Sequence, residues 1–149
     1  MTGVVTIRPV AESDRAQWQR LFAAYIAFYE AQIADDVFGV TFARLLSDEP
    51  HTHSGFVAER DDGTLVGLAH VLFHRSTWSA TGYLYLEDVF VDPDVRGGGV
   101  GRALIEAVYA HADALGATRT YWATQSFNET ARRLYDRLAT LSPFVQYRR

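Results

Sequence analysis

The sequence contains no cysteine. This absence excludes a disulfide scaffold, a metal site built on thiolates and a covalent thioester between the protein and an acyl group. Long basic runs are missing too: none exceeds the terminal pair Arg148–Arg149, and the net charge is −4. A surface for duplex DNA therefore has little support, and a cationic small substrate suits the chain better.

Long apolar runs are absent as well. None approaches the length needed to span a membrane, and the N-terminal stretch MTGVVTIRPV lacks the charged region and continuous apolar core of a signal peptide. We therefore expect a cytoplasmic protein with neither a membrane nor a nucleic-acid partner. Because the chain has 149 residues, 48% of them apolar, we expect residues 1–149 to form a single domain that carries both binding and chemistry.

The apolar pattern predicts a mixed α/β fold with one sheet and helices on its faces. The predicted strands are 4–10, 55–60, 65–73, 81–91, 118–124 and 142–147. The predicted helices are 14–29, 40–46, 100–115 and one that begins near residue 126. Asp14 is the expected N-cap of the first helix, and Ser126 with Glu129 has the spacing of a capping box. The predicted order is β-α-α-β-β-β-α-β-α-β.

The stretch DPDVRGGGVGRAL (92–104) places four glycines within five positions, between a strand-like and a helix-like segment. Such a junction presents backbone N–H groups at the positive end of a helix dipole, and glycines let phosphate oxygens approach the main chain. The dinucleotide-binding pattern Gly-x-Gly-x-x-Gly fails here, as do the P-loop and the Gly-x-Ser-x-Gly elbow of serine hydrolases. What remains is Arg96-x-x-Gly99-x-Gly101.

This pattern resembles the GNAT superfamily of acyl-CoA-dependent N-acetyltransferases, whose signature is Arg/Gln-x-x-Gly-x-Gly/Ala between the fourth strand and the third helix. The wider match is LEDVFVDPDVRGGGVGRALIEAVYAHA. A second block, NETARRLYDRL (128–138), is similar to the family's helix that carries an asparagine near coenzyme A and a tyrosine near its sulfur. The C-terminal part looks like the histone and polyamine acetyltransferase-like subgroup. The resemblance implies the GNAT fold, with a single mixed and mostly antiparallel sheet flanked by helices.

The resemblance also implies that acetyl-CoA binds as the acyl-donor cosubstrate and that no metal takes part. The main chains of Val89 and Val91 would pair with the pantetheine arm, and the N–H groups of residues 97–101 would hold the pyrophosphate. The implied cofactor-binding residues are Val89, Phe90, Val91, Arg96, Gly97, Gly98, Gly99, Val100, Gly101, Arg102 and Asn128. Tyr135 would protonate the departing thiolate, although its place on an apolar helix face is also typical of a core tyrosine.

A base must take a proton from the acceptor, because deprotonating an alkylamine of pKa about 10.4 at pH 7 costs about 4–5 kcal/mol. Glu87 and Asp88 are the only charged residues in the central strand, and alternation places them on opposite faces. Glu87 shares its parity with Val89 and Val91, so we expect Glu87 to be the base, directly or through water. The alternative is a carboxylate that a neighbouring helix or arginine satisfies. The pair would also attract a cationic substrate, which makes Asp88 a candidate substrate residue.

Tyr29 and Glu30 are further candidate substrate residues, because acidic and aromatic side chains near the end of the first helix suit an amine. A solvated helix end explains these charges equally well. The expected acceptor is a polyamine, an amino acid, another small amine or a peptide lysine, acetylated by direct transfer in a ternary complex. The resemblance implies a homodimer in which the tail 144–149 takes part. The alternatives are a CoA-binding sensor or scaffold without turnover, and an acyltransferase for a longer acyl-CoA.

Overall fold

The computed structural model describes residues 4–49, 53–95 and 97–149, which form five strands of one sheet. The strands are β1 (Val5–Pro9), β2 (His53–Arg60), β3 (Leu65–His74), β4 (Tyr83–Val91) and β5 (Arg119–Tyr121). They lie in chain order, with antiparallel pairs from β1 to β4 and a parallel pair between β4 and β5. The expected single, mixed and mostly antiparallel sheet is confirmed.

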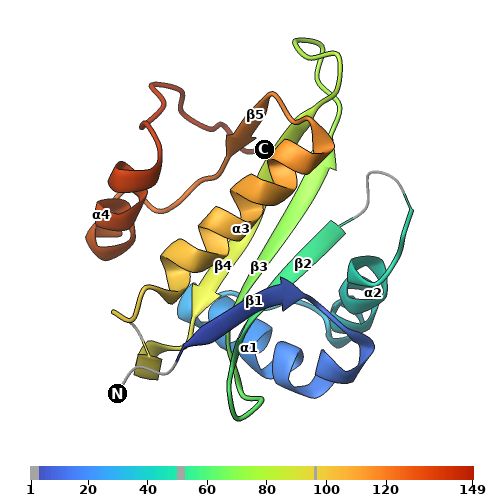
Figure 1. Ribbon diagram of the computed structural model, residues 1–149. Coiled ribbons are helices and arrows are strands. Elements are labelled where there is room, and N and C mark those ends of the chain that lie inside the picture. The colour runs from blue at the N-terminus through green and yellow to red at the C-terminus, as the bar shows by residue number, and fades with distance from the viewer. Residues whose placement is uncertain (1–3, 50–52, 96) are drawn as a thin grey trace.

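Helices cover both faces of this sheet. They are α1 (Arg15–Phe28), α2 (Asp35–Leu45), α3 (Val100–Leu115) and α4 (Glu129–Leu138), with short 3₁₀ turns η1 (Glu12–Asp14) and η2 (Pro93–Val95). Helix α3 lies across one face, α1 and α2 lie against the other, and α4 stands beside α3 beyond β4 (Figure 1). In the part of the chain that the structure describes, no helix is long and apolar enough to cross a membrane.

Each face has its own apolar core. On the face of α1 and α2, Trp18 is fully enclosed, and its ring lies 5.4 Å from that of Phe22 and 5.0 Å from that of Phe42. On the other face, α3 buries its apolar stripe against Leu84 and Leu86 of β4. Because β4 contributes to both cores, its register decides which of its side chains face which helices.

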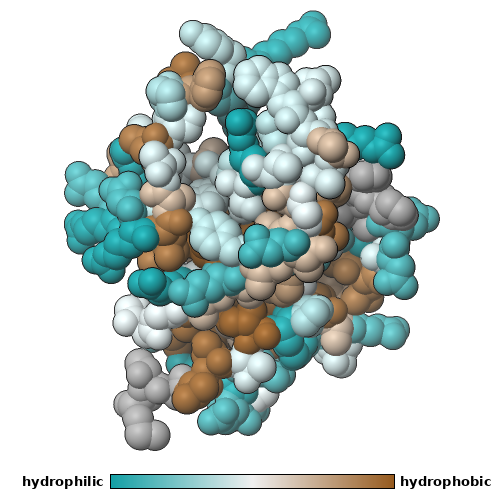
Figure 2. Space-filling view, turned by 45° about the horizontal axis from the view of Figure 1, so that its top comes forward, coloured by the Kyte–Doolittle hydropathy of each residue, from teal (hydrophilic) through white to brown (hydrophobic). Residues whose placement is uncertain are grey.

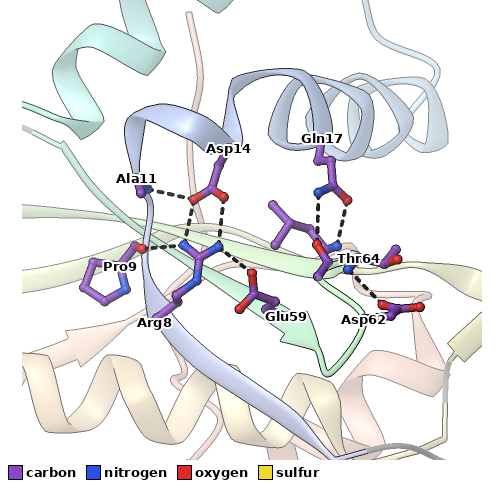
Figure 3. A network of polar contacts seen from close by, with 10 residues as sticks. Arg8, Pro9, Ala11, Asp14, Gln17, Glu59, Asp62 and Thr64 are labelled. Atoms are coloured by element: carbon purple, nitrogen blue, oxygen red, sulfur yellow. Dashed lines mark hydrogen bonds and ion pairs between the residues drawn. The ribbon is translucent and has the colours of Figure 1, made fainter.

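Arg8 of β1 ties the start of α1 to the sheet (Figure 3). Its guanidinium donates to the Asp14 carboxylate at 2.7 and 2.9 Å and to Glu59 of β2 at 2.9 Å. Asp14 also accepts a hydrogen bond from the backbone N–H of Ala11 at 2.7 Å. Its side chain therefore closes η1 and does not cap α1 as the sequence predicted. The Arg8 hydrogen bonds hold the pKa of Asp14 below its usual range.

Gln17 extends this polar layer along α1 (Figure 3). Its side-chain amide donates to the carbonyl of Gly63 at 3.1 Å and accepts from the backbone N–H of Leu65 at 2.9 Å. These bonds connect α1 to the β2–β3 turn, in which Gly63 has a φ of +86°. The predicted strands 55–60 and 65–73 thus pair as a hairpin, and α1 is held over its turn.

The predicted final strand at 142–147 is not formed in the described structure. Its apolar side chains project into solvent, since Phe144 is 87% and Val145 77% exposed. A strand needs a neighbour for its backbone hydrogen bonds, and Pro143 has no N–H to donate. Apolar composition alone was therefore not enough to make this segment a strand of the chain's own sheet.

Helix α2 begins five residues before its predicted start at residue 40. Asp35 and Asp36 occupy its first turn, where carboxylates interact favourably with the helix dipole. These acidic residues are exposed. Both carboxylates are therefore part of a solvent-exposed start of α2.

Candidate functional site

A pocket of about 410 Å³ lies where the end of β4 meets the N-terminus of α3 and one face of α4. The predicted site residues that line it are Tyr29, Val89, Phe90, Val91, Gly97, Gly99, Val100, Gly101, Arg102, Asn128 and Tyr135. Gly98 does not line the pocket, and Arg96 lies outside the described residues. Three segments that are distant in sequence therefore share one wall.

Three of the four glycines meet a structural requirement in this wall. Gly97 and Gly99 have φ angles of +89° and +80°, in the left-handed region that side chains rarely adopt. A Cβ built on either residue meets no atom within 4 Å, so the space beside them is open. At Gly101, in contrast, a Cβ would lie 3.3 Å from Cδ2 of Leu134, so glycine lets α4 approach α3 closely.

The glycine loop leads into the first turn of α3. Gly99 is its N-cap, and no side chain caps this helix end. The first N–H groups of an α-helix have no acceptor within the helix, and they lie at the positive end of its dipole. Open space, main-chain donors and a helix N-terminus together form a cradle suited to phosphate.

The pocket continues along β4 because β5 follows that strand for only part of its length. Strand β5 pairs with Tyr83, Leu84 and Tyr85 and then ends at Tyr121, six residues earlier in the register than the end of β4. Beyond that point α4, and no longer β5, forms the opposite wall, and Val89 to Val91 border the space between them. This leaves a slot beside β4 into which an extended ligand can be laid.

Asn128 and Tyr135 reach the pocket from α4. The Asn128 side chain accepts a hydrogen bond from the backbone N–H of Ala131 at 3.3 Å, so Asn128 is the N-cap of α4. The predicted capping box of Ser126 and Glu129 is therefore wrong. Tyr135 is half-buried with its ring 5.4 Å from that of Trp122. Burial, and then the neighbouring Tyr29, raises the pKa of Tyr135 to about 12, so its hydroxyl keeps its proton at neutral pH.

The alternation predicted for Glu87 and Asp88 is wrong, because the register of β4 shifts at this point. Asp88 pairs with His70 of β3 and Leu86 pairs with Val71, so Glu87 has no counterpart and forms a bulge. Such an extra residue reverses the alternation of every side chain that follows it.

Val89 and Val91, which follow the bulge, pack in the core under α3 together with Leu84 and Leu86, which precede the bulge. Glu87 therefore does not share their face as expected and instead lies near Asp88 and Tyr85. Part of the Glu87 side chain reaches solvent. Nevertheless, burial, and then the negative charge of Asp88, raises the pKa of Glu87. Neither carboxylate lines the 410 Å³ pocket.

The two candidate substrate residues at the end of α1, Tyr29 and Glu30, differ in whether they line the pocket. Tyr29 lines the pocket, whereas Glu30 is exposed and does not. Glu30 follows the helix with a φ of +55°, and its backbone N–H donates to the carbonyl of Ala27 at 2.9 Å. Its position is thus explained by the helix end.

Several residues of the pocket were not predicted from the sequence. They are Ile105 of α3 and Thr130, Ala131, Leu134 and Arg137 of α4, whereas Tyr25 and Phe28, two of the aromatic residues near the end of α1 that suit an amine, also line the pocket. The signal in α4 is its apolar stripe at three- and four-residue spacing, a pattern that is typical of a face turned to the core. No residue of α4 is fully buried, and Leu134 and Tyr135 both pack against the core under α3 and line the pocket.

A second cavity, of about 580 Å³, separates the C-terminal tail from β5 and α4. Residues 139–146 form its outer wall, and Thr120 to Thr124 form its inner wall. In the space-filling view, apolar groups lie at the surface near the top of the molecule, beside an opening between side chains (Figure 2). Residues 139–146 thus arch over this cavity beside β5.

Comparisons with known proteins match almost the whole chain to one enzyme family. The model of the acetyltransferase (GNAT) family matches residues 16–139. The D-amino-acid N-acetyltransferase HPA3 of Saccharomyces cerevisiae is 31% identical over 145 residues, which are 97% of this chain and 90% of that protein. The thialysine N-epsilon-acetyltransferase of Bos taurus is 31% identical over 133 residues, 89% of this chain and 72% of that protein.

Solved structures share the fold. The aminoglycoside N-acetyltransferase AAC(6')-Iy, in complex with the bisubstrate analog CoA-S-monomethyl-acetylneamine, matches with a TM-score of 0.81 at 21% identity and covers 99% of both chains. A ribosomal-protein-alanine N-acetyltransferase from Brucella melitensis biovar Abortus 2308 matches with a TM-score of 0.79 at 23% identity and covers 97% of both chains.

Proposed function

This chain belongs to the acetyltransferase (GNAT) family, and on that premise we propose that it transfers an acetyl group from acetyl-CoA to a primary amine within a ternary complex. When bound, acetyl-CoA supplies a thioester whose acetyl carbon the amine nitrogen attacks, so that an amide bond forms while the carbon–sulfur bond breaks. With no cysteine in the sequence, no thiol of the protein can carry the acetyl group in between.

The observation that carries this proposal is the continuity of the 410 Å³ pocket. It runs from the glycine loop, where Gly97 and Gly99 leave open space beside main-chain donors, along Val89 to Val91 and up to Tyr135. These features suit a long ligand with a pyrophosphate at one end and an extended amide-containing arm at the other. Arg102 and Asn128 line the same space and would bind polar parts of the ligand.

Glu87 is the proposed base. Its pKa is raised, first by burial and then by the charge of Asp88, so it holds a proton more strongly than an ordinary glutamate. It would accept a proton from the ammonium group of the acceptor, directly or through water. Its position in the bulge of β4 supports this role, because the side chain reaches solvent two residues before Val89, which borders the pocket.

Tyr135 is the proposed donor to the departing sulfur. With a pKa of about 12 it carries its proton across the physiological range. Full transfer to a thiolate of cysteine-like pKa, about 8.5, would be uphill by about 5 kcal/mol. We therefore assign Tyr135 a hydrogen bond to the developing negative charge, which neutralises it partially as the carbon–sulfur bond breaks.

The proposed acceptor is a small cationic amine, and the relatives are likewise named for acceptors that carry an amino group. Their names specify D-amino acids, thialysine and aminoglycosides, all of which carry amino groups. The net charge of −4 and the adjacent carboxylates of Glu87 and Asp88 favour a cation at the site. We further propose that residues 1–149 act as one domain in the cytoplasm.

The test is thiol release from acetyl-CoA in the presence of polyamines, amino acids, aminoglycosides and a lysine-containing peptide, with calorimetric titration of CoA alongside. We expect CoA to bind and one class of amine to be acetylated. If CoA binds but no amine turns over, a CoA-binding sensor replaces the enzyme. If only a longer acyl-CoA is used, the donor is wrong, and if CoA does not bind, the whole proposal fails.

We also propose that the chain forms a homodimer through its tail. Phe144, Val145 and Tyr147 are 87%, 77% and 93% exposed, and the outer edge of β5 lies across the second cavity from this segment. Exposed apolar side chains of this size are typical of an interface. Light scattering of the whole chain, and of a variant that lacks 144–149, checks this: we expect a dimer and a monomer respectively, and a monomeric whole chain would refute it.

A further inference from the structure

His70 of β3 is a buried titratable residue that the proposed reaction has not used. Only 2% of it is exposed. Its Nε2 lies 2.9 Å from the indole nitrogen of Trp18, and its Nδ1 lies 2.9 Å from Oδ2 of Asp88. Side chains from α1, β3 and β4 thus form a hydrogen-bonded row that begins inside the apolar core and ends at a carboxylate.

The two partners determine where the hydrogen of His70 resides. An indole N–H can only donate, so Nε2 of His70 accepts from Trp18 and carries a lone pair. The neutral ring then has its hydrogen on Nδ1, and this N–H donates to Asp88. The contact is therefore a hydrogen bond from a neutral imidazole and not an ion pair, and His70 does not neutralise the negative charge of Asp88.

The surroundings of His70 prevent the ring from turning. Its ring centroid is 4.8 Å from that of Phe22 in an edge-to-face contact and 5.9 Å from that of Trp18, which is itself fully buried. Across the strands, the bulge in β4 brings Asp88 directly opposite His70. One oxygen of the Asp88 carboxylate is consequently held by a donor that has no alternative orientation.

Asp88 itself is less enclosed than the residues that hold it. Its side chain is 15% exposed, and the residues that follow it in β4, Val89 and Phe90, line the pocket. On the opposite side, Tyr25 of α1 also lines the pocket, and burial, followed by the charge of Asp88, raises the pKa of this phenol. The negative charge therefore acts on Tyr25 of the pocket wall and on the neighbouring Glu87.

A purely structural connection between α1 and the sheet would not need this chemistry. Burying an imidazole and a carboxylate costs free energy that an apolar group of similar volume avoids. The arrangement gains one property from that cost: a negative charge in a defined position next to the pocket. A fixed carboxylate is what a site needs in order to bind an ammonium group without reorganising.

We propose that His70 is a positioning residue which, together with Trp18, orients the Asp88 carboxylate as a fixed anchor for the ammonium group of the acceptor amine. This inference rests on the proposed acetyl transfer, because it names the group that binds the acceptor in that reaction. The two neighbouring carboxylates then have different tasks. Asp88, held by a buried donor, binds the cation, and Glu87, in the bulge and reached by solvent, takes the proton.

Two variants of His70 separate this role from a structural one. In His70→Asn, the amide nitrogen takes the approximate place of Nδ1 and still donates to Asp88. In His70→Gln, the amide oxygen takes the approximate place of Nε2 and still accepts from Trp18, but residue 70 no longer donates to Asp88. Both variants lose the ring, so the loss of packing is matched.

The measurement is kcat and KM for the acceptor amine at saturating acetyl-CoA, with thermal unfolding as a check on folding. We expect His70→Gln to raise the acceptor KM about tenfold, equivalent to about 1.4 kcal/mol, and His70→Asn to raise it less than about threefold. The KM for acetyl-CoA should stay within about twofold in both. Equal effects of the two variants on the acceptor KM, or a change in kcat alone, would overturn the inference.

Failure of the proposed function looks different. In that case the wild-type protein turns over no amine at all, and the anchor has no cation to bind. If wild type is active but the His70 variants are unfolded, Asp88→Asn provides the substitute, because it keeps the shape and accepts the hydrogen bond from His70. We expect it to raise the acceptor KM at least about tenfold with CoA affinity unchanged, and an unchanged KM would refute the anchor.

The hydrogen-bonded row has a readout that needs neither activity nor ligand. In protein labelled with ¹⁵N-histidine, two-bond nitrogen–proton correlations report which ring nitrogen carries hydrogen. We expect His70 to be neutral with hydrogen on Nδ1 at pH 7. The opposite tautomer, or a charged ring, would contradict the orientation on which the anchor depends.

Discussion

Replacing Gly99 by alanine separates a phosphate cradle from an ordinary turn. Gly99 has a φ of +80°, and a Cβ there would meet no atom within 4 Å. The cost to stability is therefore backbone strain without a clash, about 1–2 kcal/mol for a side chain in the left-handed region. For a chain of this size, that corresponds to a fall in Tm of roughly 2–8 °C.

The effect on ligand binding should be larger than the effect on folding. The new methyl group would occupy the open space in which we place the pyrophosphate, and relief of the strain would turn the N–H groups at the start of α3 away from it. Losing one hydrogen bond to a charged group costs about 1.5–3 kcal/mol. We therefore expect the Kd for CoA, measured by titration calorimetry, to rise about 10- to 150-fold.

Gly63 offers a matched control. Its φ is +86°, a Cβ there also meets no atom within 4 Å, and it lies in the β2–β3 turn and does not line the pocket. Gly63→Ala should therefore lower Tm by a similar amount and leave the Kd for CoA unchanged. If folded Gly99→Ala binds CoA as tightly as Gly63→Ala does, the glycine loop does not hold the cofactor.

Three further changes test the catalytic assignments and the fold. Tyr135→Phe should lower kcat about 10- to 100-fold with CoA affinity unchanged, because it removes only a hydrogen bond to the departing sulfur; an unaltered kcat would dismiss Tyr135 as the donor. Asp88→Asn should shift the acid limb of the kcat/KM profile to lower pH, because the charge of Asp88 is the second cause, after burial, of the raised pKa of Glu87, and the base works only when deprotonated; no shift would argue against Glu87. Arg8→Met should lower the free energy of unfolding by about 2–3 kcal/mol at pH 7, since it leaves the enclosed Asp14 carboxylate without its partner. Because the pKa of Asp14 is lowered in the folded state, that stabilisation is fully present well above the unfolded value of 3.8 and is lost progressively as the pH falls from there through the lower pKa of the folded state. Denaturant titrations should therefore show a smaller difference at pH 3 than at pH 7.

Elements whose local pattern agrees with their packing were predictable from the sequence. The helix expected at 100–115 is observed as Val100–Leu115, and Gly116 ends it with a φ of +67°. Its apolar stripe faces a single large surface, the sheet, so periodicity and burial coincide. The glycine stretch was predictable for a similar reason, because the positive φ angles of Gly97 and Gly99 favour glycine and so are visible in the residue type itself.

Elements that depend on a partner were not predictable. The segment 142–147 has a strand-like composition, but no neighbouring strand receives it in the described chain. The apolar stripe of α4 packs against the core under α3, yet none of its residues is fully buried and Leu134 and Tyr135 also line the pocket. In both cases the sequence records that a side chain is apolar and does not record what it faces.

The bulge at Glu87 shows why both carboxylates could be found from the sequence while their faces could not. Strict alternation would place Asp88 on the side of Leu84 and Leu86, inside the apolar core under α3, where a charge without a partner costs several kcal/mol. One extra residue moves Asp88 to the other face, where His70 donates to it at 2.9 Å. The donor lies 18 residues away, and its own partner Trp18 lies a further 52 residues away. The register of β4 thus agrees with the lower free energy of the Asp88 carboxylate beside His70, which depends on contacts between α1, β3 and β4. A prediction from neighbouring residues alone does not include these contacts.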